Sequence, residues 1–235
     1  YMSKSAVSLH SDMEVIGNES IDHQYIVVDP IEKLDVLLHF LNSQEGGRGI
    51  IFCKTKAAVN KLAKNLAIRK ISSGALHGSL TQGIRDRIME QFREGYIDIL
   101  VATDLVARGI DVKELAYVVN YHLPDTHEAY VHRSGRTGRA GAKGLSMTII
   151  QQEEVKEIAD FEKELGIHFK PIKKANAEAI EWNNTLVWAK KVFKTKPNRE
   201  IPEEVKQQVK TIFHHLTKEE LVDKVLSNYL AENNK

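Results

Sequence analysis

Short apolar runs alternate with amphipathic segments through most of the chain, and this alternation is what most constrains the fold. The run from Gly49 to Cys53 is apolar throughout, which is typical of a buried strand in a parallel sheet. Further strand candidates are residues 25–28, 74–77, 97–102, 117–119 and 144–150, and helix candidates begin near Pro30, Thr55, Thr81, Thr126 and Val155, with Gly95 and Gly166 as helix ends. Strands and helices that alternate in this way predict an α/β domain, a parallel sheet covered by helices on both faces.

Polar residues follow several of these strand candidates. Residues 53–55, 77–79 and 103–104 are polar or small, although a buried strand alone does not require polar groups at its end. Because ligands of such sheets bind at the carboxyl ends of the strands, we expect the functional site at that edge.

The composition changes after Pro171, where strand signals stop. We therefore predict three parts: a linker over residues 1–20, an α/β domain over 21–170 and a helical extension over 171–235. In the extension, residues 178–194 form one helix, Pro202 opens a second, and Thr217 with Glu220 forms a capping box for a third. About sixty residues make a small independent core, so these apolar stripes must meet the main domain, each other or another chain.

The overall charge is only +1, so nucleic-acid binding would depend on a local patch. The basic stretch from Lys190 to Arg199 is interpreted as a solvated helix face in preference to an RNA contact. The single cysteine, Cys53, excludes an internal disulfide framework and is expected in the core. These features predict a cytoplasmic protein, and no apolar run approaches the roughly 20 residues that a membrane helix needs.

The segment from His132 to Arg139 carries the strongest functional signal. It holds three arginines, two glycines, a serine, a threonine and a histidine within eight residues. Arginine offers a planar charged fork that matches phosphate oxygens, and glycine allows a sharp turn and close approach of a ligand. A solvated surface loop is the alternative. We interpret this arginine segment as one that neutralises the terminal phosphate of a nucleotide.

Five segments in order resemble the second, C-terminal RecA-like domain of DEAD-box RNA helicases. Residues 49–56 are similar to motif IV, residues 82–85 to the Gln-x-x-Arg motif, residues 101–111 to motif V, residues 119–124 to the segment after it, and residues 132–139 to motif VI. The resemblance implies a RecA-like fold and an ATP-dependent RNA helicase. A translocating helicase of the same superfamily is disfavoured by the short Gln-x-x-Arg segment.

The resemblance assigns nucleotide-binding roles to matching positions. Arg133 and Arg136 would reach the γ-phosphate as catalytic arginines, while Gly109 and Asp111 would complete the ATP-binding set, with Asp111 accepting from a ribose hydroxyl. Supporting roles fall to His132, which would link to the partner domain, to Arg139, which would brace the segment, and to Asp104. We expect Asp104 to be a link to Arg136 or a local cap in preference to a catalytic base.

On the RNA side, the resemblance implies contacts to the RNA backbone and therefore weak sequence preference. The residues concerned are Thr55, Gly78, Gln82, Arg85, Thr103 and Arg108. Arg85 could instead pair with Asp86 or Glu90 on its own helix. Lys54 and Lys56 are equally compatible with solvation and with a phosphate contact. His122 departs from the family pattern, which usually has Asp there, so its role stays open.

The sequence contains no phosphate-binding loop of the Gly-x-x-x-x-Gly-Lys-Ser/Thr type and no Asp-Glu-Ala-Asp tetrad. The resemblance therefore implies that the Mg²⁺ ligands and most ATP contacts lie on an N-terminal RecA-like domain. A chain that opens with Tyr1-Met2 is expected to be a piece of a longer protein.

The helical extension resembles, more weakly, the region that follows the helicase core in bacterial cold-shock DEAD-box proteins, through residues 213–221. That region dimerises in the relatives, which implies a possible homodimer through residues 171–235, although packing within the chain is the simpler option. Two functional hypotheses follow. The chain is the C-terminal half of an ATP-dependent RNA helicase, or it is a module for dimerisation and RNA tethering without catalysis.

Overall fold

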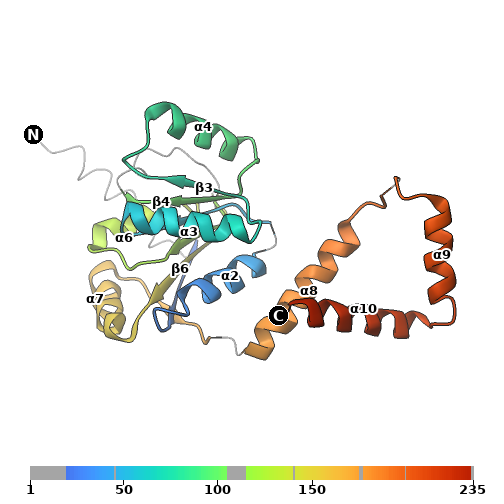
Figure 1. The fold of residues 1–235 in the computed structure, drawn as a ribbon. Helices are drawn as coiled ribbons and strands as arrows, with labels where there is room; N and C mark the ends of the chain where they lie inside the picture. The colour runs from blue at the N-terminus through green and yellow to red at the C-terminus, as the bar shows by residue number, and fades with distance from the viewer. Residues whose placement is uncertain are drawn as a thin grey trace, which may run out of the picture. The chain divides into compact units, whose positions relative to one another are not determined.

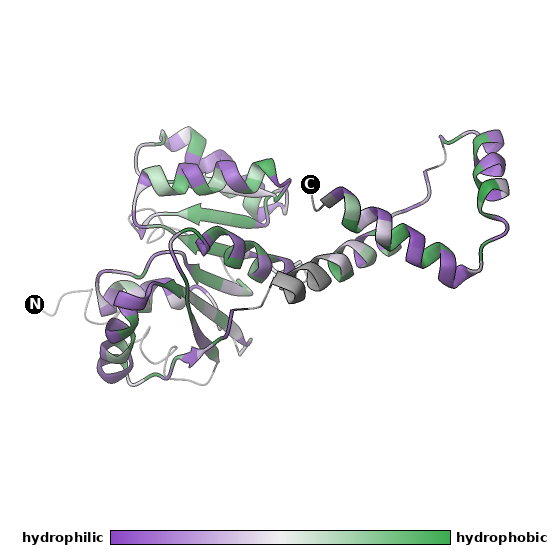
Figure 2. Ribbon diagram, turned by 60° about the horizontal axis from the view of Figure 1, so that its bottom comes forward, coloured by the Kyte–Doolittle hydropathy of each residue, from purple (hydrophilic) through white to green (hydrophobic). Residues whose placement is uncertain are grey.

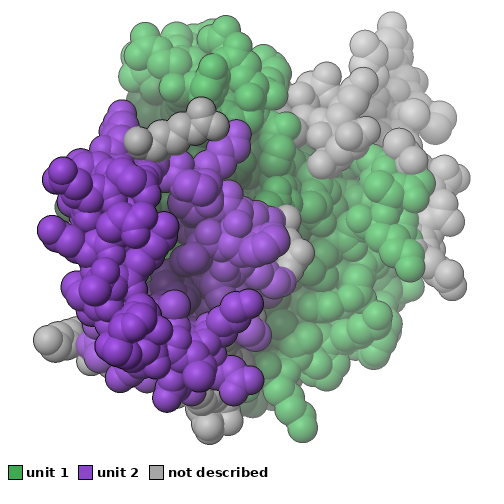
Figure 3. All heavy atoms as spheres, turned by 90° about the vertical axis from the view of Figure 1, so that its right-hand side faces the viewer, with its two compact units in different colours: residues 1–38, 44–174 green, residues 39–43, 175–235 purple. Residues whose placement is uncertain are grey.

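The computed structural model describes residues 20–44, 46–104, 115–139, 141–174, 177–198 and 200–233, with the backbone alone over 177–184. The chain divides into two compact units, which Figure 3 colours separately. Unit 1 holds residues 1–38 and 44–174, and unit 2 holds residues 39–43 and 175–235. Each unit is described by itself.

Unit 1 is built on a parallel sheet with strand order β3-β4-β2-β5-β6-β1-β7. The strands are β1 (Ile21–Val27), β2 (Gly49–Phe52), β3 (Ser73–Leu76), β4 (Ile99–Ala102), β5 (Tyr117–Asn120), β6 (Gly144–Ile150) and β7 (Lys170–Pro171). The predicted RecA-like parallel sheet is confirmed. Only β7 was not anticipated, since it has two residues and one of them is a proline, which is restricted to sheet edges.

The helices of unit 1 cover both faces of this sheet (Figure 1). They are α2 (Lys33–Ser43), whose last residues belong to unit 2, α3 (Lys56–Ile68), α4 (Gln82–Arg93), α6 (His127–Ser134) and α7 (Val155–Leu165). Right-handed crossovers place α2 and α3 on one face and α4, α6 and α7 on the other. The core agrees: Phe92 of α4 packs with Ile50 and Val118, and Tyr130 of α6 contacts Ser146, the register partner of Val118.

The middle of the sheet is the core of unit 1. Every residue of β2, β4 and β5 is buried, and these strands are mostly green in the hydropathy colouring of Figure 2. Cys53, directly after β2, is fully buried, as predicted, and burial raises the pKa of its thiol to about 12. Parallel strands covered on both faces require such continuous apolar runs, which is why the sequence pattern identified them.

The helix boundaries follow local chemistry in most cases. The side chains of Thr55 and Thr126 accept hydrogen bonds from the backbone N–H groups of Ala58 and Ala129, both at 3.1 Å. Gly166 ends α7 in the left-handed conformation. Thr81 occupies the N-cap position of α4, as expected for a helix that begins there, but its side chain makes no capping hydrogen bond.

Unit 2 consists mainly of α8 (Ala177–Lys194), α9 (Glu203–Phe213) and α10 (Lys218–Asn233). Trp188 stacks on Tyr229 at 4.2 Å between ring centroids. The predicted capping box is confirmed, because Thr217 N–H donates to Glu220 and Glu220 N–H donates to the Thr217 hydroxyl. Within the described residues, the helices are too short or too polar to span a membrane.

Candidate functional site

The carboxyl ends of the parallel strands bring several predicted site residues to one edge of the sheet. Thr55, Gly78 and Thr103 follow β2, β3 and β4, which are neighbours in the sheet. Thr103 N–H donates to Leu76 O at 3.2 Å, and so joins the end of β4 to the end of β3. These three candidate RNA contacts therefore lie on adjacent loops at the predicted functional edge.

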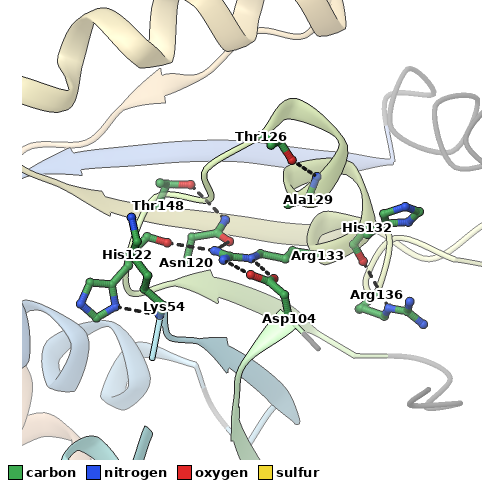
Figure 4. Close-up of polar contacts among 10 residues, drawn as sticks. All are labelled: Lys54, Asp104, Asn120, His122, Thr126, Ala129, His132, Arg133, Arg136 and Thr148. Carbon is green, nitrogen blue, oxygen red and sulfur yellow. Dashed lines mark hydrogen bonds and ion pairs between the residues drawn. The ribbon is translucent and has the colours of Figure 1, made fainter. Parts of the chain in front are cut away.

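Arg133, at the end of α6, is the best-anchored side chain at this edge (Figure 4). Its Nε donates to one Asp104 carboxylate oxygen at 2.5 Å and its Nη2 to the other at 2.7 Å. Its Nη1 donates to Asn120 Oδ1 at 3.1 Å and to the carbonyl oxygen of His122 at 2.9 Å. Four hydrogen bonds thus hold a guanidinium that has five N–H groups.

This ion pair links a buried cation to a half-exposed anion. The Arg133 side chain is only 3% exposed, whereas the Asp104 side chain is 42% exposed. The guanidinium also lies over the ring of Phe52, 5.1 Å from its centroid, and Asn120 donates in turn to the Thr148 hydroxyl at 3.2 Å. A buried charge with this many partners stabilises a fixed geometry and is costly to remove.

The rest of the arginine segment is fastened by its small residues. The Ser134 hydroxyl lies 3.1 Å from that of Ser146, and the buried Thr137 hydroxyl donates to Leu115 O. Gly138 has a φ of +66°, and a Cβ there would lie 2.5 Å from a side-chain carbon of Ile21. The glycine expected to permit a sharp turn is therefore required both by conformation and by space.

Arg136 and Arg139 are held differently from Arg133. In each, Nε donates to the carbonyl oxygen four residues earlier, that of His132 and that of Gly135 respectively. Both side chains are partly exposed. In Figure 4 the Arg136 guanidinium points away from the cluster around Asp104. His132 pairs with Glu128, one turn earlier on α6, at 3.3 Å.

One expectation about this segment needs correction. Asp104 pairs with Arg133 and not with Arg136, because β4 lies close to β5 in the sheet and Arg133 is the arginine that faces the space between their ends. Arg133, assigned to the γ-phosphate by resemblance, makes four hydrogen bonds inside the protein, and its phosphate role stays a prediction.

The candidate RNA-binding residues on α4 form a local network. Arg85 donates to Gln82 Oε1 at 3.2 Å, and Gln82 donates to Asp86 at 2.7 Å. The pairing of Arg85 with Asp86 or Glu90, considered as an alternative, is not formed. Arg85 is partly exposed, so the network orients its guanidinium at the surface of α4 without burying it.

Lys54 makes a contact that neither predicted alternative, solvation or a phosphate contact, included. Its ammonium forms an ion pair with Asp125 at 2.6 Å, and both side chains are largely exposed. This pair raises the pKa of Lys54, first through the hydrogen bond and then through the charge of Asp125. Exposed pairs of this kind contribute little to stability.

His122 is more than a polar surface residue. Its carbonyl oxygen accepts from Arg133, and its Nδ1 accepts from the backbone N–H of Lys54 at 3.4 Å. Burial lowers the pKa of this imidazole to about 4, and the charges of Lys33, Arg133 and Lys54 act in the same direction. The ring is therefore neutral at physiological pH.

Three predicted residues, Arg108, Gly109 and Asp111, lie outside the described residues, as does the predicted linker apart from Ser20. In the part of the chain that is described, no group of three or more His, Cys, Asp and Glu side chains could hold a metal ion.

Sequence reasoning assigned no role to Asn120, although it belongs to the segment similar to the family pattern. It is fully buried and supplies one of the four acceptors of Arg133. The available signal was a polar amide at the end of an otherwise apolar strand, where buried polar groups need partners.

Comparisons with known proteins identify both parts of the chain. Residues 32–141 match the helicase conserved C-terminal domain, and residues 180–232 match the helical domain of a probable ATP-dependent RNA helicase. The chain is 47% identical over 148 residues to DEAD-box ATP-dependent RNA helicase 46 of Arabidopsis thaliana, covering 63% of this chain and 23% of that protein.

Two solved structures are similar in fold and in sequence. The C-terminal domain of the DEAD-box protein Dbp5 is 33% identical with a TM-score of 0.61, covering 66% of this chain and 91% of that domain. Saccharomyces cerevisiae Dbp5 bound to RNA and ADP BeF3 is 31% identical with a TM-score of 0.63, covering 75% of this chain and 46% of that protein.

The chain belongs to the DEAD-box ATP-dependent RNA helicase family, as its C-terminal RecA-like domain followed by a helical domain. It spans 23–25% of the length of the first three curated relatives.

Proposed function

We propose that this chain is the C-terminal half of an ATP-dependent RNA helicase and forms one wall of a composite ATP site. The observation that carries the proposal is the arginine segment, which the pair of buried Arg133 with half-exposed Asp104 fixes at the carboxyl edge of the sheet. Fixed guanidinium groups that face an incoming phosphate are what phosphoryl transfer requires, since they need no reorganisation in the transition state.

Within this proposal the three arginines divide the work. Arg133 positions the segment, and Arg136 contacts the γ-phosphate, with Arg139 held in the same manner one turn on. Arg133 therefore takes the bracing role that resemblance gave to Arg139, and Arg139 takes the phosphate-contacting role that resemblance gave to Arg133. ATP, when bound, supplies the phosphoryl group, and Mg²⁺ with its ligands belongs to the preceding RecA-like domain. Asp111 and Gly109 remain proposed nucleotide contacts.

The RNA side of the proposal uses the adjacent loops. Thr55, Gly78 and Thr103 follow three neighbouring strands, and the oriented Arg85 lies on the helix after Gly78. Dbp5 with bound RNA has the same fold. Backbone N–H groups, hydroxyl groups and one guanidinium suit sugar–phosphate contacts and not base readout. Closure of the two domains around ATP would then clamp single-stranded RNA and separate short duplexes.

RNA-stimulated ATP hydrolysis by the full-length protein tests this proposal. Arg136→Ala is expected to lower turnover by about 10³-fold or more, the range known for an arginine finger. Arg87→Ala is the control, because Arg87 is an exposed arginine on α4. Turnover within about twofold of wild type for Arg136→Ala would refute the assignment, because removal of a contact to the transition state must lower turnover.

We further propose that the helical extension forms a homodimer. Val205, Val209, Ile212 and Phe213 of α9 are each at least 41% exposed, so this helix carries an apolar stripe. Sedimentation of the chain is expected to show a concentration-dependent dimer that Ile212→Glu dissociates. A monomer at all concentrations would exclude dimerisation.

A further inference from the structure

A pocket that includes His122 in its lining lies at the carboxyl edge of unit 1. Its volume is about 290 Å³, and its polar walls come from Lys33, Lys61, Asn65, Tyr121, His122 and Gln151. These residues belong to α2, α3, the segment after β5 and the end of β6. The pocket shares only the backbone of His122 with the contacts of Arg133.

The cation at the base of this pocket is poorly satisfied. Lys33 is only 5% exposed, and its ammonium group donates to the carbonyl oxygen of Ile149 at the long distance of 3.4 Å. An ammonium has three donors. Within the described part of the chain, no carboxylate lies within ion-pair distance of Lys33, although buried charges are usually paired.

The side chains that line the pocket carry only positive charge. Lys61 is an exposed ammonium at the mouth, and the residues that line the pocket include no carboxylate. Burial lowers the pKa of Lys33, while the charge of Glu154 opposes that effect from a greater distance. The His122 ring accepts from Lys54 through Nδ1, which assigns the proton of the neutral ring to Nε2, a donor.

We propose that this pocket binds a small oxyanion, the phosphate or carboxylate group of a small molecule, with Lys33 as its central contact. A water molecule occupies about 30 Å³ in the liquid, so the volume admits one such group and a short apolar portion. Pro30 and Leu62 provide apolar wall for that portion. The pocket therefore differs from the nucleotide site in its cations and in its position on the sheet edge.

Position 122 makes the proposal testable, because it is where the sequence departs from the family pattern. An aspartate there would bring a carboxylate to the same pocket wall and satisfy Lys33 from within the chain. Removal of the Lys33 charge and addition of an internal carboxylate should therefore both weaken capture of an external anion, because each change makes the pocket less positive.

The experiment is a titration of the full 235-residue chain with sodium phosphate and with sodium acetate, followed by ¹H–¹⁵N NMR at constant ionic strength set with sodium chloride. Saturable shifts are expected at the amides of Lys33, His122 and Gln151, and the anion with the tighter midpoint identifies the ligand group. Lys33→Met and His122→Asp should each weaken the midpoint by about tenfold or more. Lys64→Met, an exposed lysine on the same helix as Lys61, is the matched control.

Two results would overturn the proposal. One is the absence of saturable shifts with either anion, which would mean that the carbonyl contact of Lys33 suffices. The other is binding that persists undiminished in His122→Asp, a variant that keeps every cation of the pocket and adds the competing carboxylate. If Lys33→Met does not fold, the His122→Asp titration decides the question alone.

Discussion

The assignment of Arg133 as a bracing residue leads to a prediction about stability. Replacement by methionine keeps an apolar stem of similar length over the Phe52 ring and removes all four hydrogen bonds. Asn120 then has a buried carbonyl oxygen without a donor, which costs about 1–3 kcal/mol. Asp104 loses its partner, but it is 42% exposed, so water compensates for most of that loss. The carbonyl oxygen of His122 also loses its donor, which costs about 1 kcal/mol, so the expected total is about 2–4 kcal/mol.

Cys53 is a suitable reporter for this measurement. It is the only cysteine in the chain, it is fully buried, and it lies in unit 1. Both tryptophans, in contrast, lie in unit 2, so their fluorescence would report the wrong unit. Reaction of Cys53 with a thiol reagent in urea measures the free energy of opening. A loss of about 2–4 kcal/mol predicts labelling of Arg133→Met about 30- to 1000-fold faster than wild type.

Two comparisons make the result interpretable. Arg87→Met removes an exposed arginine from α4 and should change the opening free energy by less than about 0.5 kcal/mol. A double-mutant cycle with Asp104→Asn should give a coupling energy of about 0.5–1 kcal/mol, because water compensates for most of the loss at the half-exposed carboxylate. If Cys53 is labelled no faster in Arg133→Met than in Arg87→Met, Arg133 is not a structural brace. The prediction that Arg133 contacts the γ-phosphate would then be favoured.

Further predictions concern conformation, pH and RNA. Gly138→Ala should destabilise unit 1 by more than Gly141→Ala in the same thiol-labelling assay, because both have positive φ but only Gly138 meets a neighbour, the Ile21 side chain. The pKa of His122 in the folded chain is about 4, below its unfolded value near 6.5. The free energy of unfolding of unit 1 should therefore fall by up to about 3 kcal/mol as the pH decreases from 6.5 to 4. Urea unfolding followed by circular dichroism should show a smaller decrease for His122→Asn, and an equal decrease would exclude His122 as the source. Arg85→Ala should weaken binding of single-stranded RNA to the full-length protein by about 5- to 10-fold, with Arg87→Ala near wild type; equal effects would remove the special role of Arg85.

The fold was predictable from the sequence because its signals are local. Fully apolar strands such as β2 and threonine caps such as Thr55 depend on a few adjacent residues. The partner of Asp104 was not predictable in the same way. Arg133 is 29 positions from Asp104, and the choice between Arg133 and Arg136 depends on the order of β4, β2 and β5 in the sheet, which is non-local information.

The role of Lys33 was equally hidden from sequence analysis. A lysine at the start of a predicted helix is normally solvated, and only the packing of α2 and α3 at the sheet edge encloses this one. Arg136, in contrast, is a γ-phosphate contact that both the resemblance and the spacing of the arginine segment predict, and this role stays a proposal. Residue type therefore predicted the kind of site, whereas the partner of Arg133 and the burial of Lys33 depend on the topology of the sheet.

The central claim is that this chain supplies half of a site that acts only when ATP joins it to another domain. The affinity of the full-length protein for single-stranded RNA, with and without ADP and beryllium fluoride, tests that claim most directly. Wild type should bind RNA at least about tenfold more tightly with the nucleotide, whereas Arg136→Ala and the isolated 235-residue chain should show no gain. A full nucleotide-dependent gain in either of them would contradict the account.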